Sequence, residues 1–129
     1  MEKISGGCLC GAVRYQLVGP LSAPHVCHCG QCRKQSGHQS ASTHLMRKDF
    51  KLTEDRGLKW YRSSEVAERG FCKECGSSLF WDDGGEEIYI CVGSLNEPTG
   101  LTIDKHIFVS KKGDYYEISD NLPQFSRYD

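Results

Sequence analysis

The sequence predicts an all-β fold made of short antiparallel sheets. Apolar and polar side chains alternate over several short runs, and glycine, proline, serine or aspartate residues separate one run from the next. Only one segment has the composition of a helix, and it is one or two turns long. The chain of 129 residues has the length of one ordinary domain, so residues 1–129 are expected to fold as a single domain.

The strands are justified in order along the chain. The first is predicted over residues 12–18, where Val13, Tyr15 and Leu17 alternate with polar residues and Gly19-Pro20 ends the run. The later strands are predicted over residues 58–61, 78–81, 87–92, 107–110 and 115–119.

Two tight turns and one helix complete the prediction. Asp82-Asp83-Gly84-Gly85 lies between two predicted strands and indicates a hairpin. Lys111-Lys112-Gly113-Asp114 separates the last two predicted strands and indicates a second hairpin. The helix is expected over residues 31–36, because Gly37 is suited to end it.

Eight cysteines fall into three close clusters and one singleton. The clusters are Cys8-x-Cys10, Cys27-His28-Cys29-x-x-Cys32 and Cys72-x-x-Cys75, and the singleton is Cys91. No apolar signal region precedes the first cluster, so we expect a cytoplasmic protein whose thiols stay reduced. Close clusters of reduced cysteines favour metal binding, and disulfide pairing is the alternative interpretation.

Four of the cysteines fit a closed, structural zinc site. The spacing of Cys72 and Cys75 lets both sulfur atoms face one metal ion, and Gly76 permits the tight turn around it. Structural zinc has four tetrahedral ligands, so another pair must supply the other two. Cys8 and Cys10, with glycines on both sides, fit that role and would join the N-terminal strand to the middle of the chain.

Three other cysteines fit a second zinc site with an open position. Cys27 and Cys29 share one face of an extended segment, and Cys32 returns at the next turn, so the three sulfur atoms can converge. His28 is expected to point away from the metal. The fourth position is open to water, a substrate thiol or a protein group such as Cys91 or a histidine, and a bound thiol would be held as a thiolate.

Several other residues are weaker candidates for the site. Cys91 is interpreted first as a semi-buried strand cysteine and second as a functional thiol. Arg33 and Lys34 are interpreted as a solvated turn, or as partners for the carboxylates of a small anionic ligand. His38 is the first candidate for an acid or base, whereas His25, His44 and His106 lack the spacing of metal ligands.

The charge balance argues against two classes of partner. The formal net charge is −1 and the isoelectric point is about 6.5, which gives no attraction to nucleic acid or to an anionic membrane. The longest apolar runs are far shorter than a membrane span. A small-molecule partner fits the sequence better.

The cysteine clusters stand within longer segments that match a known family. The segments are Gly6-Gly7-Cys8-Leu9-Cys10-Gly11-Ala12-Val13-Arg14-Tyr15, Cys27-His28-Cys29-x-x-Cys32-Arg33, Ser36-Gly37, Phe71-Cys72-x-x-Cys75-Gly76-Ser77, Gly93-Ser94-Leu95-Asn96-Glu97-Pro98, His106-Ile107-Phe108-Val109 and Leu122-Pro123-Gln124-Phe125. With them the chain resembles, over nearly its whole length, the glutathione-dependent formaldehyde-activating (GFA) family, whose domain is also found in centromere protein V.

The resemblance implies a fold, two metal sites and an activity. The fold is a β-tent of antiparallel sheets, and each chain binds two zinc ions. Purified protein is therefore expected to hold two zinc ions per chain, or one tight and one labile. The implied ligands are Cys8, Cys10, Cys72 and Cys75 for a structural zinc, and Cys27, Cys29 and Cys32 for a second, catalytic zinc. The implied activity is that of a carbon-sulfur lyase, an S-(hydroxymethyl)glutathione synthase, which joins glutathione and formaldehyde.

The chain departs from the family in two places. His38-Gln39-Ser40-Ala41-Ser42 stands where many members carry small or apolar residues, and Gly113-Asp114-Tyr115-Tyr116 replaces a Pro-Trp pair. Both changes concern the substrate and not the fold. Two alternative functions are therefore kept: a zinc-stabilised protein-binding module without catalysis, and a thiol redox sensor.

Overall fold

The structure, a computed structural model, describes residues 3–128 and consists mostly of β-sheet with one short helix. This confirms the predicted all-β fold class. The chain divides into two compact units. The first unit comprises the chain up to Ser22 together with Thr43–Gly100, and the second comprises Ala23–Ser42 together with the chain from Leu101 on. Within residues 3–128 no helix is long and apolar enough to cross a membrane.

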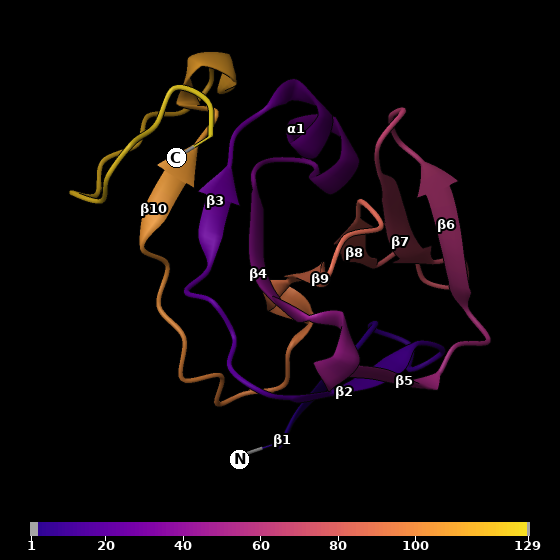
Figure 1. The fold of residues 1–129 in the computed structure, drawn as a ribbon. Coiled ribbons are helices and arrows are strands. Elements are labelled where there is room, and N and C mark those ends of the chain that lie inside the picture. The colour runs from indigo at the N-terminus through magenta and orange to yellow at the C-terminus, as the bar shows by residue number, and fades with distance from the viewer. Residues whose placement is uncertain (1–2, 129) are drawn as a thin grey trace. The chain divides into compact units, whose positions relative to one another are not determined.

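The first unit contains most of the strands (Figure 1). Its elements are β1 (Lys3–Gly7), β2 (Arg14–Val18), η1 (Arg47–Asp49), β5 (Phe50–Glu54), β6 (Leu58–Arg62), β7 (Glu68–Cys72), β8 (Ser78–Asp82), β9 (Glu87–Cys91) and η2 (Val92–Ser94). β1, β2 and β5 form an antiparallel sheet in that order. β9, β8, β7 and β6 follow one another in a second antiparallel arrangement.

The second unit is smaller and carries the only α-helix of the described residues. Its elements are β3 (His25–Cys27), α1 (Gly30–Ser36), β10 (Lys105–Ile107) and η3 (Val109–Lys111), and β4 (Ser40–Met46) begins in it. β3 pairs antiparallel with β4 and parallel with β10. The parallel pair departs from the all-antiparallel expectation.

The core of the first unit is built around the side chains of β2. Tyr15 and Leu17 are each 1 % exposed, and the Tyr15 hydroxyl forms a hydrogen bond of 2.5 Å with the Ser94 hydroxyl. The Tyr15 ring also packs edge-on against Phe80, with the ring centroids 5.5 Å apart. A Cβ atom at Gly6 would collide with the Tyr15 hydroxyl and the Ser94 carbonyl oxygen, so only glycine allows this close approach.

Most of the predicted elements are present at their predicted places. β2, β6, β8 and β9 match the strands predicted over residues 12–18, 58–61, 78–81 and 87–92. The antiparallel pairing of β8 with β9 confirms the hairpin between them. The predicted helix is α1, which ends at Gly37 with φ of 91°.

The hairpin predicted between residues 107–110 and 115–119 is wrong. The first predicted strand, residues 107–110, is replaced by β10, which begins two residues earlier and ends at Ile107, and by η3, which follows it. Residues 115–119 form no strand. Phe108, between β10 and η3, has φ of 57°, a left-handed backbone conformation that ends an extended strand.

Polar contacts hold the segment after η3 in a turn. The Lys112 ammonium group donates to the carbonyl oxygens of Gly113 and Tyr116, at 3.1 and 2.6 Å. The side chains of Tyr115 and Tyr116 form hydrogen bonds with histidines of the same unit. The tyrosines that indicated a strand therefore serve side-chain contacts instead of cross-strand pairing.

The sequence pattern did not predict β1, β3, β4, β5 or β7. β1 and β7 contain glycine, which is uncommon inside strands. In β7 the glycine has a packing reason, because a Cβ atom at Gly70 would press into the rings of Trp60 and Phe80. Tertiary packing thus favours β7 against the local preference of its glycine.

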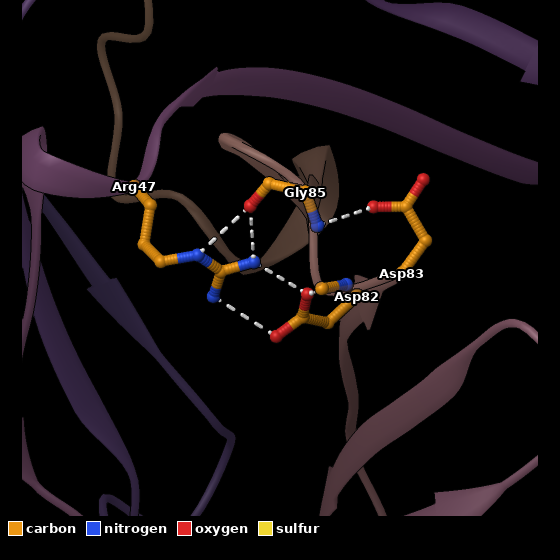
Figure 2. A network of polar contacts seen from close by, with 5 residues as sticks. Arg47, Asp82, Asp83 and Gly85 are labelled. Atoms are coloured by element: carbon orange, nitrogen blue, oxygen red, sulfur yellow. Dashed lines mark hydrogen bonds and ion pairs between the residues drawn. The ribbon is translucent and has the colours of Figure 1, made fainter.

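The turn between β8 and β9 is held by one arginine (Figure 2). The Arg47 guanidinium group donates to both carboxylate oxygens of Asp82, at 3.0 and 2.6 Å, and to the carbonyl oxygen of Gly85. The same contact with Arg47 lowers the pKa of Asp82 below its usual value. Arg47 precedes β5, so this contact ties the β8–β9 turn to a distant part of the same unit.

The bidentate contact between Arg47 and Asp82 gives a stability prediction. Arg47→Lys should lower the free energy of unfolding by about 1 kcal/mol, because an ammonium group cannot bind both Asp82 oxygens and Gly85 in this geometry. Urea unfolding at pH 7 with zinc present measures the change. The matched control is Lys48→Met, which removes the exposed cation next to Arg47 in η1 and should change the free energy by less than about 0.5 kcal/mol. Equal losses in the two variants would contradict the assignment.

Candidate metal centres

Four cysteines of the first unit meet at one point. The sulfur atoms of Cys8, Cys10, Cys72 and Cys75 all lie within 4.8 Å of one another. We call this set the four-cysteine cluster. The Sγ atoms of Cys8 and Cys10 are 3.7 Å apart, and those of Cys10 and Cys72 are 3.8 Å apart. Four sulfur atoms placed about 2.3 Å from a central zinc at tetrahedral angles would be separated by roughly 3.8 Å, so the cluster fits this ion.

The backbone around the four-cysteine cluster is folded to present these sulfurs. The loop that carries Cys8 closes through two contacts with Val13, whose amide donates to the Cys8 sulfur at 3.2 Å. The turn after Cys72 closes through the Gly76 amide, which donates to the Cys72 carbonyl oxygen at 2.7 Å. Gly76 has φ of 81°, a conformation that glycine adopts at little cost.

Ser77 links the two halves of the four-cysteine cluster. Its hydroxyl oxygen accepts a hydrogen bond from the Leu9 amide at 3.1 Å and lies 3.2 Å from the Cys75 sulfur. Hydrogen bonds from Ser77 lower the pKa of the Cys75 thiol to about 5. This residue therefore favours the thiolate form that a metal ion requires.

Three cysteines of the second unit form a separate set, here called the three-cysteine cluster. The sulfur atoms of Cys27, Cys29 and Cys32 all lie within 4.8 Å of one another. Cys27 ends β3, and Cys29 is the N-cap of α1, where its sulfur accepts a hydrogen bond from the Cys32 amide at 3.2 Å. The short helix thus returns the third sulfur to the other two.

The three thiols do not ionise independently. The hydrogen bond from Cys27 lowers the pKa of Cys29 to about 2, with a further contribution from Cys32. The hydrogen bond with Cys29 raises the pKa of Cys27 far above its usual value. Without a cation the cluster carries one favoured thiolate, so binding of a metal to all three sulfurs would release protons and depend on pH.

His28, between two of these cysteines, is fully buried and hydrogen-bonded at both ring nitrogens. Its Nδ1 atom lies 2.6 Å from the Tyr116 hydroxyl, and its Nε2 atom lies 2.8 Å from Nδ1 of His106. His106 in turn contacts both carboxylate oxygens of Asp120 through Nε2, at 3.1 and 3.0 Å. Burial is the first cause that lowers the pKa of His28, to about 4. His28 is therefore neutral near pH 7 and has no ring nitrogen left for a metal ion.

A second histidine–tyrosine contact lies beside this one. Nδ1 of His38 is 2.8 Å from the Tyr115 hydroxyl, and the His38 ring packs edge-on against the Tyr116 ring at 4.8 Å. The Lys112 ammonium group lies 5.1 Å from the centroid of the Tyr116 ring. Burial is the first cause that raises the pKa of Tyr116.

The other predicted candidates lie outside the two clusters. Cys91 ends β9. Neither it nor any of the seven other cysteines of the described residues forms a disulfide. His44 pairs with Glu87 at 2.7 Å. Arg33 donates to the Lys111 carbonyl oxygen at 3.3 Å, and both Arg33 and Lys34 lie in the last turn of α1.

Sequence reasoning missed two of the residues in the hydrogen-bonded group around His28, which lies between Cys27 and Cys29. Tyr116 and Asp120 have no motif spacing to Cys27 or Cys29, and they meet His28 and His106 only through the fold. A weak signal existed for His106, which stands in one of the segments that match the family.

Comparison with known proteins establishes the family to which this chain belongs. The family model described as "Glutathione-dependent formaldehyde-activating enzyme" matches residues 3–111, which include all seven clustered cysteines. The chain belongs to the GFA family. This confirms the resemblance drawn from the sequence.

Individual GFA relatives are distant in sequence. A protein of Schizosaccharomyces pombe, named as an uncharacterised lyase, is 26% identical over 128 residues, which cover 98% of this chain and 93% of the relative. A protein of Halomonas elongata, named provisionally as a glutathione-dependent formaldehyde-activating enzyme, is 26% identical over 126 residues, covering 89% of this chain and 80% of the relative. The crystal structure of a Rhodobacter sphaeroides protein matches with a TM-score of 0.62 at 22% identity, covering 77% of this chain and 97% of that one, which supports the fold.

The contacts of Ser77 give a prediction for the four-cysteine cluster. Ser77→Ala should weaken its affinity for zinc or cobalt by about tenfold, because the Cys75 thiolate loses a hydrogen bond and the Leu9 amide loses its acceptor. Competition with a chromophoric chelator measures the affinity. Ser77→Thr keeps the hydroxyl and serves as the control, with an expected change of less than about threefold. Loss of affinity in both variants would show that the hydroxyl is not the cause.

Proposed function

We propose that this chain is a zinc-dependent carbon-sulfur lyase of the GFA type, which acts on the adduct of formaldehyde with glutathione or another small thiol. The supporting observation is the three-cysteine cluster, whose three sulfur atoms lie within 4.8 Å of one another. Among the described residues, no fourth histidine, cysteine or carboxylate ligand atom belongs to this group. Catalytic zinc sites characteristically keep one coordination position open in this way. The family membership and the names of two relatives support the same chemistry.

The two clusters are proposed to have different roles. Cys8, Cys10, Cys72 and Cys75 would hold a structural zinc with all four positions filled by protein sulfur. Cys27, Cys29 and Cys32 would hold a second, more labile zinc. A thiol bound at the open position of that ion would be deprotonated at neutral pH and held beside the aldehyde. The cytoplasm, where thiols stay reduced, is the compartment proposed for this chemistry.

The proposed reaction balances without an oxidant or reductant. The thiol sulfur forms a bond to the formaldehyde carbon, and the π electrons of the carbonyl group move to oxygen. The proton lost by the sulfur ends on that oxygen, which gives the hydroxymethyl thioether. The reverse reaction breaks the same carbon-sulfur bond. Positioning of the two reactants is the main contribution that the protein can make.

Exchange spectroscopy tests the proposed activity directly. Nuclear magnetic resonance of carbon-13 formaldehyde with glutathione should show that the protein speeds adduct exchange by at least about tenfold, within the range expected for positioning by a bound metal. Cys29→Ser should abolish the increase because it removes one of the three sulfur ligands. Cys91→Ser, which removes a cysteine outside both clusters, is the matched control and should keep the full rate. A wild-type protein without any increase would favour the non-catalytic binding module.

The division of roles also predicts how the two clusters affect folding. Cys72→Ser should lose one zinc and most of the folded protein, since structural zinc contributes about 10 to 16 kcal/mol of apparent binding free energy, comparable with the whole stability of a domain. Cys29→Ser should stay folded with one zinc fewer. Circular dichroism and elemental analysis measure the two effects. The opposite pattern, unfolding of Cys29→Ser alone, would reverse the assigned roles.

A further inference from the structure

Four polar side chains of the second unit form a continuous row of hydrogen bonds that includes His28, the residue between Cys27 and Cys29. The row runs Asp120, His106, His28, Tyr116, with successive contacts of 3.0, 2.8 and 2.6 Å. We call it the histidine column. Its two histidines are 5 % and 0 % exposed, whereas Asp120 at one end reaches the surface. Buried polar groups linked in this way hold one another in a single arrangement.

The histidine column lies on the opposite side of the backbone from the Cys27 sulfur. In the parallel pairing of β3 with β10, His106 is opposite Val26 and Ile107 is opposite Cys27. Side chains alternate along a strand, so His106 shares a face with His28, and Cys27 points to the other face. The backbone of His28 is fixed as well, because its amide donates to the Ile107 carbonyl oxygen at 3.1 Å.

His28 is the one residue between Cys27 and Cys29, so its backbone conformation sets the distance between their sulfur atoms. Its ring is held at Nδ1 by Tyr116 and at Nε2 by His106, which leaves the ring no freedom to rotate. Three cysteines fill only three of the four tetrahedral positions of a zinc ion. The positions of their sulfur atoms therefore depend on the contacts that hold the backbone between them.

We propose that Asp120, His106, His28 and Tyr116 act together as positioning residues, which hold Cys27 and Cys29 in the geometry that binds the second metal ion. The inference rests on the proposed function only in taking the three-cysteine cluster as a metal site. It assigns the histidine column no contact with the thiol or the aldehyde. Removal of a contact in the column weakens the second metal site and leaves the four-cysteine cluster unchanged.

The hydrogen bonds of the column have a defined direction. A carboxylate only accepts, so the hydrogen bonded to Asp120 is on Nε2 of His106. In a neutral His106 ring Nδ1 then accepts from Nε2–H of His28, and Nδ1 of His28 accepts from the Tyr116 hydroxyl. In this arrangement each bond donates toward Asp120, and both rings carry their hydrogen on Nε2.

Metal competition in the intact protein tests the proposal, with no thiol or aldehyde substrate present. The probe is cobalt followed by its thiolate absorption, and the four-cysteine cluster is the internal reference in every titration. Tyr116→Phe, which removes only a hydroxyl, and Asp120→Ala should each weaken the second site by about tenfold and the first by less than about twofold. Asp120→Asn keeps an acceptor oxygen and should recover most of the affinity.

Two matched controls separate the column from its surroundings. Tyr115→Phe removes a neighbouring hydroxyl that contacts His38, and Asp114→Ala removes an exposed carboxylate of the same segment. Both should leave the two metal affinities within about twofold of the wild type. Unchanged second-site affinity in Tyr116→Phe and Asp120→Ala overturns the proposal, and so does an equal loss at both clusters.

Nitrogen-15 spectra of the histidine rings provide a readout that simple loss of stability would not produce. His28 and His106 should both show a protonated Nε2 and an unprotonated Nδ1, and Tyr116→Phe should shift the Nδ1 signal of His28. A hydrogen on Nδ1 of His28 overturns the proposed direction. A protein that binds the second metal but lacks lyase activity refutes the proposed function and leaves this inference standing, because the metal affinities are measured without substrate.

Discussion

The convergence of four cysteine sulfur atoms is the constraint on which the first unit depends. Cys8 and Cys10 follow β1, whereas Cys72 and Cys75 flank the turn between β7 and β8, and the fold brings all four to within 4.8 Å. Four thiolates at this distance repel one another unless a cation lies between them. One bound ion would therefore join segments that are 62 residues apart, as Cys10 and Cys72 are. The strands that the local sequence disfavours, β1 and β7, are the ones that lead into this cluster.

The two cysteine clusters differ in how completely they could surround a metal ion. The four-cysteine cluster supplies a complete tetrahedron, so a metal there would fix the geometry of its own ligands. The three-cysteine cluster supplies an incomplete set, and its ligands must be held by something else. The fold provides a helix that returns Cys32 and a buried ring at His28. In the proposed function these contacts would keep the site defined while one coordination position stays open.

The sequence predicted the clusters well and their surroundings poorly, for one physical reason. Cysteines separated by one or two residues stay close whatever the rest of the chain does, so Cys27, Cys29 and Cys32 were recognisable from spacing alone. His28 and His106 are 78 residues apart, and their contact requires the parallel pairing of β3 with β10. The alternating pattern near residues 107–119 indicated a hairpin, because tyrosines favour strands and nothing local shows that they bind histidines.

The departures from the family pattern fall on this same part of the molecule. Tyr115 and Tyr116 stand in one of the two segments that differ from the family pattern, residues 113–116, and His38 stands in the other, residues 38–42. In the structure these residues contact one another: His38 bonds to Tyr115, and its ring packs against Tyr116. Two separate changes in sequence thus form one group of interacting side chains next to the histidine column. The seven clustered cysteines converge in this chain despite these changes. The differences therefore concern the surroundings of the three-cysteine cluster, and not whether its sulfur atoms come together.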